Sequence, residues 1–392
     1  MRIGIAGPLD LNIIKELFSE SERFAIDNIK GLGGSQPAQY ALWLLKGGHE
    51  LFLYTTSVSV PKGEERLFSS SRVTLKIGHR PGPVARMVTF QFGEIQGITR
   101  MIIADKPDII HAQWSYEFAM GAIKSGLPHI ITVRDWAPKI LFHTRHPYRL
   151  MRLFLSFLVF FKGDYFVANS PYLHRKLLFL KRRIFPFIPN GISDNFLLQA
   201  AKVFNSKNLV IVAINNGADG GKNTRKLLEA FSLLSADYTD IYLKLIGLGH
   251  ETHSKLWRWA SDNKLLDNVE FLGPLKFDSV LNELDESDLM VHPSLEESFG
   301  NIIVEAMCRG VPVIAGRESG AVPWVVADAG LLVDVSSAKS IAEAIRSFYQ
   351  NRDLLNRYSK AGFENVKSRF TLSAITESYT CYYSNIMSGP VD

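Results

Sequence analysis

The most constraining feature of this sequence is a repeated alternation of short apolar segments with longer amphipathic ones. Short apolar runs indicate strands, and apolar residues spaced by about 3.6 positions indicate helices. In the first half of the chain the alternation runs from a strand at Arg2–Ala6 to a helix at Pro171–Phe179. Strands that alternate with helices predict a parallel sheet with helices on both faces.

A break near Pro189-Asn190-Gly191 separates the two halves of the chain. Turn residues are followed there by a polar and weakly patterned stretch, 193–207. The alternation then restarts with a strand at Leu209–Ile214 and continues to a helix at Ala338–Gln350. The second half therefore predicts another α/β unit of the same kind.

The length and the two alternating halves together predict an α/β fold of two Rossmann-like, doubly wound domains. We expect an N-terminal domain at 1–200 and a C-terminal domain at 201–370. A long helical stretch, interrupted near Phe370-Thr371, predicts a C-terminal helix at 371–392 that packs back on the N-terminal domain. Doubly wound sheets bind ligands at the carboxyl ends of their strands, so two such domains facing each other would form a cleft.

Composition excludes several classes of protein. Hydrophobic residues make up 46% and charged residues 21%, which suits a globular protein with full-sized cores. The two cysteines, Cys308 and Cys381, are far apart and outside any CxxC pattern, which argues against a zinc site and a disulfide framework. The N-terminus lacks the pattern of a signal peptide, and no apolar run reaches the ~18 residues of a membrane span. We expect a cytoplasmic protein without a metal.

One apolar segment allows two interpretations. Met151–Lys162 is almost wholly apolar, with Arg149 and Arg152 near its start. It is either a buried helix of the N-terminal domain or an interfacial helix in peripheral contact with the inner face of the cytoplasmic membrane. The net charge of +5 favours anionic partners in general, but no nucleic-acid-binding motif is present, so we expect no nucleic-acid partner.

The sharpest local pattern is HPSLEESFGNIIVEAM, which begins at His292. A buried strand is followed by a loop and then a helix, for which Ser298 is a plausible N-cap. Backbone amides at Phe299, Gly300 and Asn301 would point at a ligand, and a helix N-terminus favours an anion there. Gly300 would let a ligand approach the backbone closely.

Two carboxylates accompany this turn. Glu297 lies in the loop and Glu305 about one turn into the helix. A carboxylate can accept two hydroxyl hydrogen bonds, so both side chains suit sugar or ribose recognition. The alternative is that Glu297 is a solvated loop charge and Glu305 a surface helix residue.

Two glycine-rich turns are candidates for phosphate binding. Residues 215–222 follow a strand and end at Lys222, which could place a point charge on a diphosphate, although a solvated loop lysine is the alternative. The turn at Gly33-Gly34 precedes a helix and suits either phosphate or a simple tight turn. The first is not a Walker A loop, and the second does not fit a nicotinamide-binding fingerprint.

Taken together, these residues resemble the retaining glycosyltransferases of family 4, the group 1 enzymes with the GT-B fold. The resemblance spans nearly the whole chain in the family's order. Its motifs are Gly33-Gly34 with Gly48-His49-Glu50-Leu51, Ile188-Pro-Asn-Gly191, Lys222 in KNTRKLLEAF, Glu297-x7-Glu305, Gly310-Val-Pro-Val313 and Gly330-Leu-Leu-Val333.

The resemblance implies a role for each matching residue. Glu305 would hold the ribose hydroxyls of the nucleotide, and Glu297 would contact the hydroxyls of the donor sugar. Lys222 and the Gly33-Gly34 turn would stabilise the diphosphate. The base would lie near 271–273. The donor-binding residues implied are Gly33, Gly34, Asn216, Lys222, Leu272, Glu297, Ser298, Phe299, Gly300, Asn301 and Glu305, and the catalytic ones are Glu297, Lys222 and Arg134.

The sequence departs from the family pattern near the expected diphosphate. An arginine often found before the lysine is absent at 215–217, and Arg134-Asp135 stands where the family often has His-Asp. Arginine cannot act as a general base at neutral pH. Two roles for Arg134 therefore stay open: it replaces the missing positive charge, or it binds an anionic acceptor.

The activity implied is metal-independent, retaining transfer of a glycosyl group from a nucleotide-diphosphate sugar, used as co-substrate, without any further cofactor. The acceptor would be a saccharide or lipid-linked saccharide in bacterial surface polysaccharide biosynthesis. We expect acceptor specificity to lie in N-terminal-domain loops at 61–71 and 139–148. Two alternatives are a non-catalytic nucleotide-sugar-binding protein and a hydrolysing nucleotide-sugar epimerase.

Overall fold

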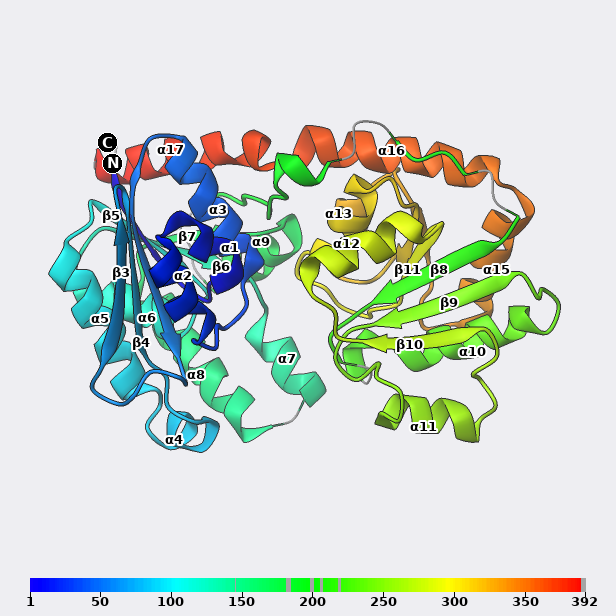
Figure 1. Cartoon of the computed structure of the whole chain (residues 1–392), viewed down its shortest axis with the longest axis horizontal. Helices are drawn as coiled ribbons and strands as arrows, with labels where there is room; N and C mark the ends of the chain where they lie inside the picture. The colour runs from blue at the N-terminus through cyan, green and yellow to red at the C-terminus, as the bar shows by residue number, and fades with distance from the viewer. Residues whose placement is uncertain (145, 181–184, 198–200, 205–206, 218–219, 389–392) are drawn as a thin grey trace. The chain divides into compact units, whose positions relative to one another are not determined.

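The structure is a computed structural model that describes residues 1–388, with gaps at 145, 181–184, 198–200, 205–206 and 218–219 (Figure 1). The chain divides into unit 1, Met1–Gly191 with Leu372–Asp392, and unit 2, Ile192–Thr371. Ile192 and Thr371 pair in an isolated parallel bridge, so both ends of unit 2 lie side by side. The unit boundary after Gly191 precedes the expected one at 200/201, and 198–200 and 389–392 lie outside the described residues.

Unit 1 contains a seven-stranded sheet in the order β3-β4-β2-β1-β5-β6-β7. Every neighbouring pair is parallel except β3 and β4. The strand order reverses between β1 and β5, which is the position where doubly wound sheets bind ligands. The strands are β1 Arg2–Ala6, β2 Glu50–Ser57, β3 Glu65–Ser70, β4 Val73–His79, β5 Ile109–Gln113, β6 His129–Val133 and β7 Tyr165–Ala168.

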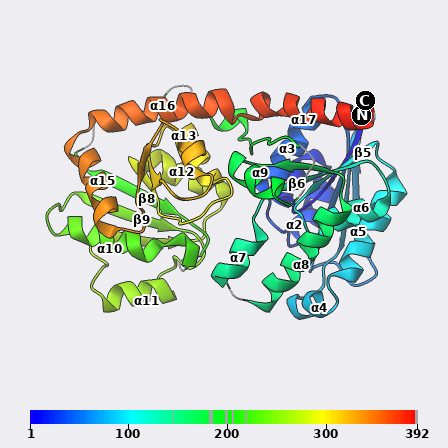
Figure 2. The same cartoon turned by 180° about the vertical axis from the view of Figure 1, so that it is seen from behind.

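Helices cover both faces of this sheet, as the two views in Figures 1 and 2 show. Separate buried clusters lie on the two faces, one around Ile5 and Leu44, the other around Ile98 and Phe166. The helices are α1 Leu11–Ile14, α2 Glu20–Asp27, α3 Ser35–Lys46, α4 Pro83–Val88, α5 Phe92–Asp105, α6 Glu117–Ser125, α7 Ala137–Thr144, α8 Pro147–Lys162, α9 Pro171–Leu178 and α17 Leu372–Met387, with a 3-10 turn at Lys15–Leu17.

The last helix, α17, belongs to the core of unit 1. Tyr383 is fully buried, and its hydroxyl lies 2.9 Å from the hydroxyl of Tyr40 and 2.6 Å from Nδ1 of His111. Tyr379 packs against the rings of both Tyr40 and His111. These polar contacts inside an apolar cluster fix α17 against α3 and β5.

Unit 2 contains a six-stranded sheet in the order β10-β9-β8-β11-β12-β13, and all its neighbouring pairs are parallel. The strand order reverses between β8 and β11. The strands are β8 Leu209–Ile214, β9 Ile241–Ile246, β10 Val269–Gly273, β11 Leu289–His292, β12 Val313–Gly316 and β13 Leu331–Val333.

The helices of unit 2 also cover both faces of its sheet. Residues of α10, α11 and α15 pack on one buried cluster, and residues of α12, α13, α14 and α16 on another. Their bounds are α10 Thr224–Ser235, α11 Lys255–Asp262, α12 Phe277–Glu286, α13 Asn301–Cys308, α14 Val322–Val326, α15 Ala338–Gln350 and α16 Asp353–Arg369, with 3-10 turns at Asp194–Phe196 and Gly220–Lys222.

Two parallel-sheet, Rossmann-like units confirm the predicted fold class. The interruption near Phe370-Thr371 is confirmed as the break between α16 and α17. The expectation of acceptor loops at 61–71 and 139–148 is wrong in part, because β3 occupies most of the first segment, and α7 and α8 take up much of the second. In the part of the chain that the structure describes, no helix is long and apolar enough to cross a membrane.

Candidate functional site

The best-organised site of unit 2 lies where its strand order reverses. Main-chain and side-chain contacts tie together the loops that follow three neighbouring strands. The N–H of Leu295 donates to the carbonyl of Gly221 (2.7 Å), and the N–H of Ala321 donates to the carbonyl of Glu297 (2.9 Å). The segments joined in this way are 215–217 and 220–223 after β8, 293–300 after β11 and 317–321 after β12.

Lys222 and Glu297 meet at this edge of the sheet. Nζ of Lys222 lies 2.6 Å from Oε1 of Glu297, and Nε2 of His292 donates to the same oxygen at 3.2 Å. Burial opposes ionisation of Glu297, but the His292 hydrogen bond and the Lys222 ammonium outweigh it and lower its pKa to about 2. No described residue hydrogen-bonds to Oε2 of Glu297, which leaves one carboxylate oxygen available as an acceptor.

Glu305 is in the opposite electrostatic situation. It is half-buried on α13, and among the described residues its carboxylate has no hydrogen-bond or ion-pair partner. Burial raises its pKa to about 7. Two carboxylates whose environments move their pKa values apart are typical of functional sites, because each can then take a different role. Neither residue is the solvated surface charge that the sequence left open.

The N-terminus of α13 differs from the prediction. The N-cap is Gly300, with φ 94° and ψ 61°, and not Ser298. A left-handed φ turns the chain into the helix at this position, and a Cβ there would lie 3.1 Å from Cδ1 of Ile303. Gly300 has no side chain to cap the first turn, so the amides at the start of the helix suit an anion.

The ring of Phe299 belongs to the core and not to a binding surface. It is 2% exposed and packs edge-on against Phe370, with ring centroids 5.6 Å apart. Any contact of Phe299 with a donor would therefore come from its backbone. Asn301 is the first residue of α13 and is half-buried.

The glycine-rich loop after β8 is held against the loop after β9. Asn216 is exposed, and its Oδ1 accepts from the N–H of Leu248 (3.2 Å), while the N–H of Gly217 donates to the carbonyl of Leu248 (2.8 Å). Leu272 is half-buried at the end of β10 and bridges to Glu251. Ala218 and Asp219, part of the predicted phosphate loop, lie outside the described residues.

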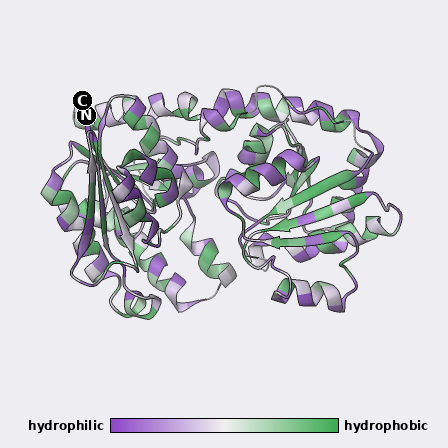
Figure 3. Cartoon of the chain, in the orientation of Figure 1, coloured by the Kyte–Doolittle hydropathy of each residue, from purple (hydrophilic) through white to green (hydrophobic). Residues whose placement is uncertain are grey.

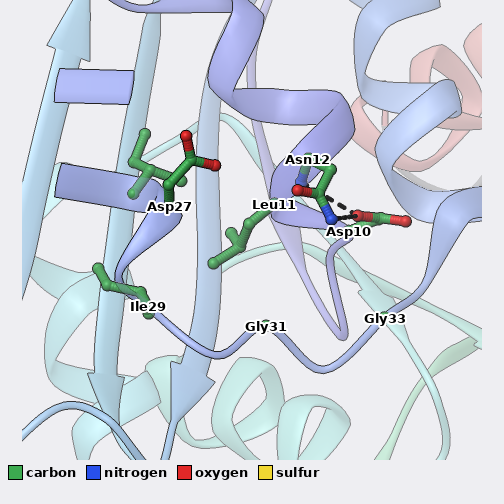
Figure 4. A pocket seen from close by; sticks show the side chains of 8 residues that line it. Asp10, Leu11, Asn12, Asp27, Ile29, Gly31 and Gly33 are labelled. Carbon is green, nitrogen blue, oxygen red and sulfur yellow. Dashed lines mark hydrogen bonds between the residues drawn. The ribbon is translucent and has the colours of Figure 1, made fainter. Parts of the chain in front are cut away.

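The glycine turn of unit 1 borders a small cavity. Gly34 is the N-cap of α3, with φ 115°, and a Cβ there would lie 2.3 Å from the carbonyl oxygen of Pro8. Gly33 has φ 70° and open space where a Cβ would be. Gly33 lines a cavity of about 200 Å³ together with the side chains of Asp10 and Asn12 (Figure 4). This turn therefore has room for a polar ligand beside it.

Arg134 is anchored inside unit 1. Its Nε and Nη2 donate to Oε1 of Gln113 (3.0 and 2.5 Å), and its Nη1 donates to Oδ1 of Asn190 (2.5 Å). Burial lowers its pKa, yet an arginine keeps its charge at neutral pH. The side chain therefore links the ends of β5 and β6 to the turn that precedes unit 2.

A buried charge cluster in unit 1 escaped the sequence analysis. Arg86 donates to Glu94 (2.9 Å) and Glu117 (3.0 Å), and Arg80 lies 2.7 Å from Glu94 and 3.5 Å from Glu117. Both glutamate side chains are fully buried. We call these four residues the arginine–glutamate cluster. The sequence signal was faint, because the four residues come from a loop and three different helices and share no recognisable spacing.

The structure thus brings together only part of the predicted set. Lys222 and Glu297 touch, and they share unit 2 with Glu305 and the α13 N-terminus, whereas Gly33, Gly34 and Arg134 belong to unit 1. His292, which orients Glu297, was missed as a functional residue although its strand was identified. Within the described ranges no group of three or more His, Cys, Asp or Glu side chains is arranged to hold a metal ion.

Two solved structures share this fold. The sucrose-phosphate synthase of Thermosynechococcus elongatus superposes with a TM-score of 0.77 at 17% identity, covering 99% of this chain and 100% of that one. Anabaena HepE in complex with UDP superposes with a TM-score of 0.67 at 16% identity, covering 98% of this chain and 100% of that one.

Sequence comparisons identify the family. LpsE of Rhizobium meliloti, a lipopolysaccharide core biosynthesis glycosyltransferase, is 32% identical over 160 residues, which cover 40% of this chain and 45% of LpsE. The aligned region therefore spans less than half the length of that relative. The family model for group 1 glycosyl transferases matches residues 196–365, and the model for glycosyltransferase family 4 matches residues 38–196. With both units matched in order, the chain belongs to the group 1, family 4 glycosyltransferases.

Proposed function

We propose that this protein transfers a glycosyl group, with retention of configuration, from a nucleotide-diphosphate sugar to a saccharide or lipid-linked saccharide. The observation that carries the proposal is the arrangement in unit 2 of Lys222, ionised Glu297 and unpartnered Glu305 at the reversal of strand order. This arrangement offers one cation and two hydroxyl acceptors at the edge where such sheets bind ligands.

The proposed chemistry depends on charge that develops on the leaving group. Breaking the glycosyl–phosphate bond moves negative charge onto the diphosphate. The Lys222 ammonium and the first amides of α13 would stabilise that charge most in the transition state. Nζ of Lys222 has three donors and spends one on Glu297, so it can contact a phosphate oxygen without leaving the carboxylate.

The two carboxylates would hold the two ends of the donor. Glu297 is fixed through Oε1 by Lys222 and His292, so its Oε2 would accept from a sugar hydroxyl. Glu305 would accept from the ribose hydroxyls, which would supply the partners that the protein itself does not. Asn216, Leu272, Ser298 and the backbone at 299–301 complete the proposed donor contacts in unit 2.

The residues of unit 1 take a supporting part in the proposal. The turn at Gly33-Gly34 would add backbone donors near the diphosphate. Arg134 would contribute positive charge from a fixed position, since Gln113 and Asn190 hold its guanidinium. No metal and no further cofactor is part of this mechanism.

The substrate classes are proposed from the relatives. HepE binds UDP, and LpsE acts in lipopolysaccharide core biosynthesis, which supports a nucleotide-sugar donor and a surface-saccharide acceptor. A lipid-linked acceptor would place the protein at the inner face of the cytoplasmic membrane, in contact through Met151–Lys162. The pathway proposed is bacterial surface polysaccharide biosynthesis.

The test is a thermal-shift panel with UDP, GDP, ADP and dTDP and their common sugars. A ligand at 100 times its Kd stabilises by about 2.7 kcal/mol, which raises Tm measurably. We expect a shift with one nucleotide family that is lost in Glu305→Ala and kept in Glu343→Gln, a control on the exposed side of α15. No shift with any nucleotide at millimolar concentration would overturn the proposal.

The product then separates the remaining possibilities. With donor and acceptor present, we expect a glycoside whose anomeric configuration by NMR matches that of the donor. An inverted product would contradict retention. Nucleotide binding without turnover would indicate a binding protein, and free sugar formed without an acceptor would indicate an epimerase that hydrolyses its donor.

A further inference from the structure

Helix α8 is apolar on two different sides. Met151, Leu155 and Val159 are buried against unit 1. Four other apolar side chains point to solvent at intervals of three or four positions, so they form one stripe along the helix. This stripe consists of Leu150, Phe154, Phe157 and Phe161, whose exposed fractions are 59%, 53%, 44% and 86%. A helix that only filled a core would not need the second apolar side.

A second apolar surface adjoins the stripe. Val84 and Val88 of α4 are 71% and 69% exposed, and Phe90 follows directly. The rings of Phe90 and Phe154 pack edge to face, with centroids 6.1 Å apart. Phe90 also has φ 48°, a left-handed conformation that is strained for a bulky residue and that native structures keep where it serves a purpose.

These two surfaces form one apolar face, which we define as the stripe of α8 with Val84, Val88 and Phe90. Figures 1 and 2 both show α4 beside α8, and Figure 3 colours much of both helices as hydrophobic. An apolar groove of about 600 Å³ between α7 and α8, lined by Leu141, Phe142 and Leu150 among others, continues it. Contiguous exposed apolar surface of this kind marks an interaction site.

Basic side chains predominate around the apolar face, and Asp164, two positions after Lys162, is an exposed acid near its end. Neither 66–93, which contains α4, nor 136–163, which contains α7 and α8, includes an Asp or Glu. Arg149 and Lys162 flank the stripe, and neither has an ion-pair partner among the described residues. A surface that presents aromatic side chains with Lys and Arg in excess over acids matches an anionic phospholipid surface. A protein partner would more often meet charges of both signs at the rim.

We propose that the apolar face docks unit 1 on an anionic phospholipid bilayer. The proposal deepens the lipid-linked acceptor of the proposed function and rests on it for its purpose. α4 follows β4, and α7 and α8 follow β6. The face is therefore built from segments that leave the carboxyl edge of the sheet, where an acceptor would bind. Docking here would bring that edge to the membrane surface that carries the acceptor.

The experiment is vesicle flotation of the full chain with phosphatidylcholine alone and with phosphatidylcholine mixed with phosphatidylglycerol. We expect binding to the mixed vesicles that weakens as salt is raised. Phe161→Ser and Phe154→Ser should each weaken it about tenfold, the effect of losing one inserted aromatic side chain. Phe24→Ser is the matched control, since Phe24 is 75% exposed on α2, away from the face, and should change binding less than twofold.

Three results would overturn the docking proposal. The first is no binding to either kind of vesicle, and the second is an equal loss of binding in Phe161→Ser and Phe24→Ser. The third is a dimer, detected by sedimentation velocity, that Phe161→Ser dissociates. That result would make the face an interface between copies of the chain. The nucleotide thermal shift of the same variants keeps the two proposals separate. Vesicle binding without any nucleotide thermal shift would contradict only the proposed donor site. A nucleotide thermal shift without vesicle binding would contradict only the proposed docking face.

Discussion

Charged side chains at the carboxyl edges of the two sheets have different fates. In unit 1, Arg86 and Arg80 form ion pairs with Glu94 and Glu117, so the four charges of the arginine–glutamate cluster are paired with one another. In unit 2 the Glu305 carboxylate has no partner among the described residues, and burial raises its pKa to about 7. The paired charges of unit 1 stabilise its fold, whereas the unpartnered carboxylate of unit 2 can still form hydrogen bonds with a ligand.

This difference suggests how the work is divided between the units. A carboxylate kept without partners costs stability, and a site can recover that cost only when a ligand binds. Unit 2 bears such a cost and carries the proposed donor site. In unit 1 the charges of the arginine–glutamate cluster are paired with one another, and what this unit offers instead is a small polar cavity beside Gly33 and an exposed apolar face.

Breaking the arginine–glutamate cluster should give the largest effect. Arg86→Met would leave Glu94 with Arg80 as its cation, and Glu117 with Arg80 and the more distant Arg152, 4.0 Å away. Removing one partner of a buried ion pair costs about 3–5 kcal/mol. We expect a correspondingly lower stability of unit 1 in chemical denaturation. The pair Arg86→Met with Glu94→Gln should recover part of the loss.

The control for that prediction is a surface pair of the same chemistry. Arg66 and Glu64 lie 3.1 Å apart, with side chains about half exposed. Arg66→Met should change stability by less than about 0.5 kcal/mol. If Arg86→Met and Arg66→Met lose the same amount of stability, the ion pairs of the arginine–glutamate cluster do not stabilise unit 1. The comparison between the two units would then be wrong.

Removing the cation of the donor site should give the next largest effect. Lys222→Ala takes away the ammonium expected to stabilise the leaving diphosphate, and the loss of one such group costs about 100- to 1,000-fold in kcat. Steady-state kinetics would show it. Lys226→Ala is the matched control, because Lys226 pairs with Glu229 on the surface of α10. A change confined to KM would mean that Lys222 only binds the donor.

The smallest effect is the pH dependence set by Glu305. Its pKa of about 7 in the folded chain lies above the usual 4.5, so the folded state favours the protonated form. The stability that protonated Glu305 provides is fully present below about pH 4.5 and is lost as the pH rises through about 7. We expect wild type to lose Tm relative to Glu305→Gln between pH 5 and pH 8.

Nucleotide binding should become stronger as the pH rises from 5 to 8, whereas the stability of the free protein falls. Ribose hydroxyls donate to the ionised carboxylate, so the thermal shift with nucleotide should grow as pH rises in wild type and stay flat in Glu305→Gln. Glu343→Gln should follow wild type in both measurements. Parallel curves for wild type and Glu305→Gln would show that Glu305 does not titrate in this range.

Features that depend on local sequence pattern, namely the two sheets and the motif residues of unit 2, could be predicted from the sequence. The two alternating halves predicted both sheets, and the motifs pointed to Lys222 and Glu297, which the structure joins at 2.6 Å. Ser298 was wrongly taken as the helix cap because its side chain suits that position. The left-handed φ of Gly300 decides where the helix begins, and the spacing of residues does not reveal it.

Contacts between distant segments were beyond sequence reasoning. Arg134 meets Asn190, 56 positions later, and the arginine–glutamate cluster gathers side chains from several elements. The segment Met151–Lys162 was ambiguous for a related reason. Periodicity cannot tell a buried apolar side from an exposed one, and α8 has both.

The return of α17 to unit 1 has a consequence for protein synthesis. Tyr383 contacts Tyr40 and His111 across more than 270 intervening positions, all of unit 2 among them. On the ribosome, β1 to β7 would emerge first but lack the helix that completes their core. Unit 2, continuous in the chain, can finish folding earlier. The order of folding would then be the reverse of the order of translation, and a nascent chain stopped before residue 372 would expose an unfinished core to chaperones and proteases.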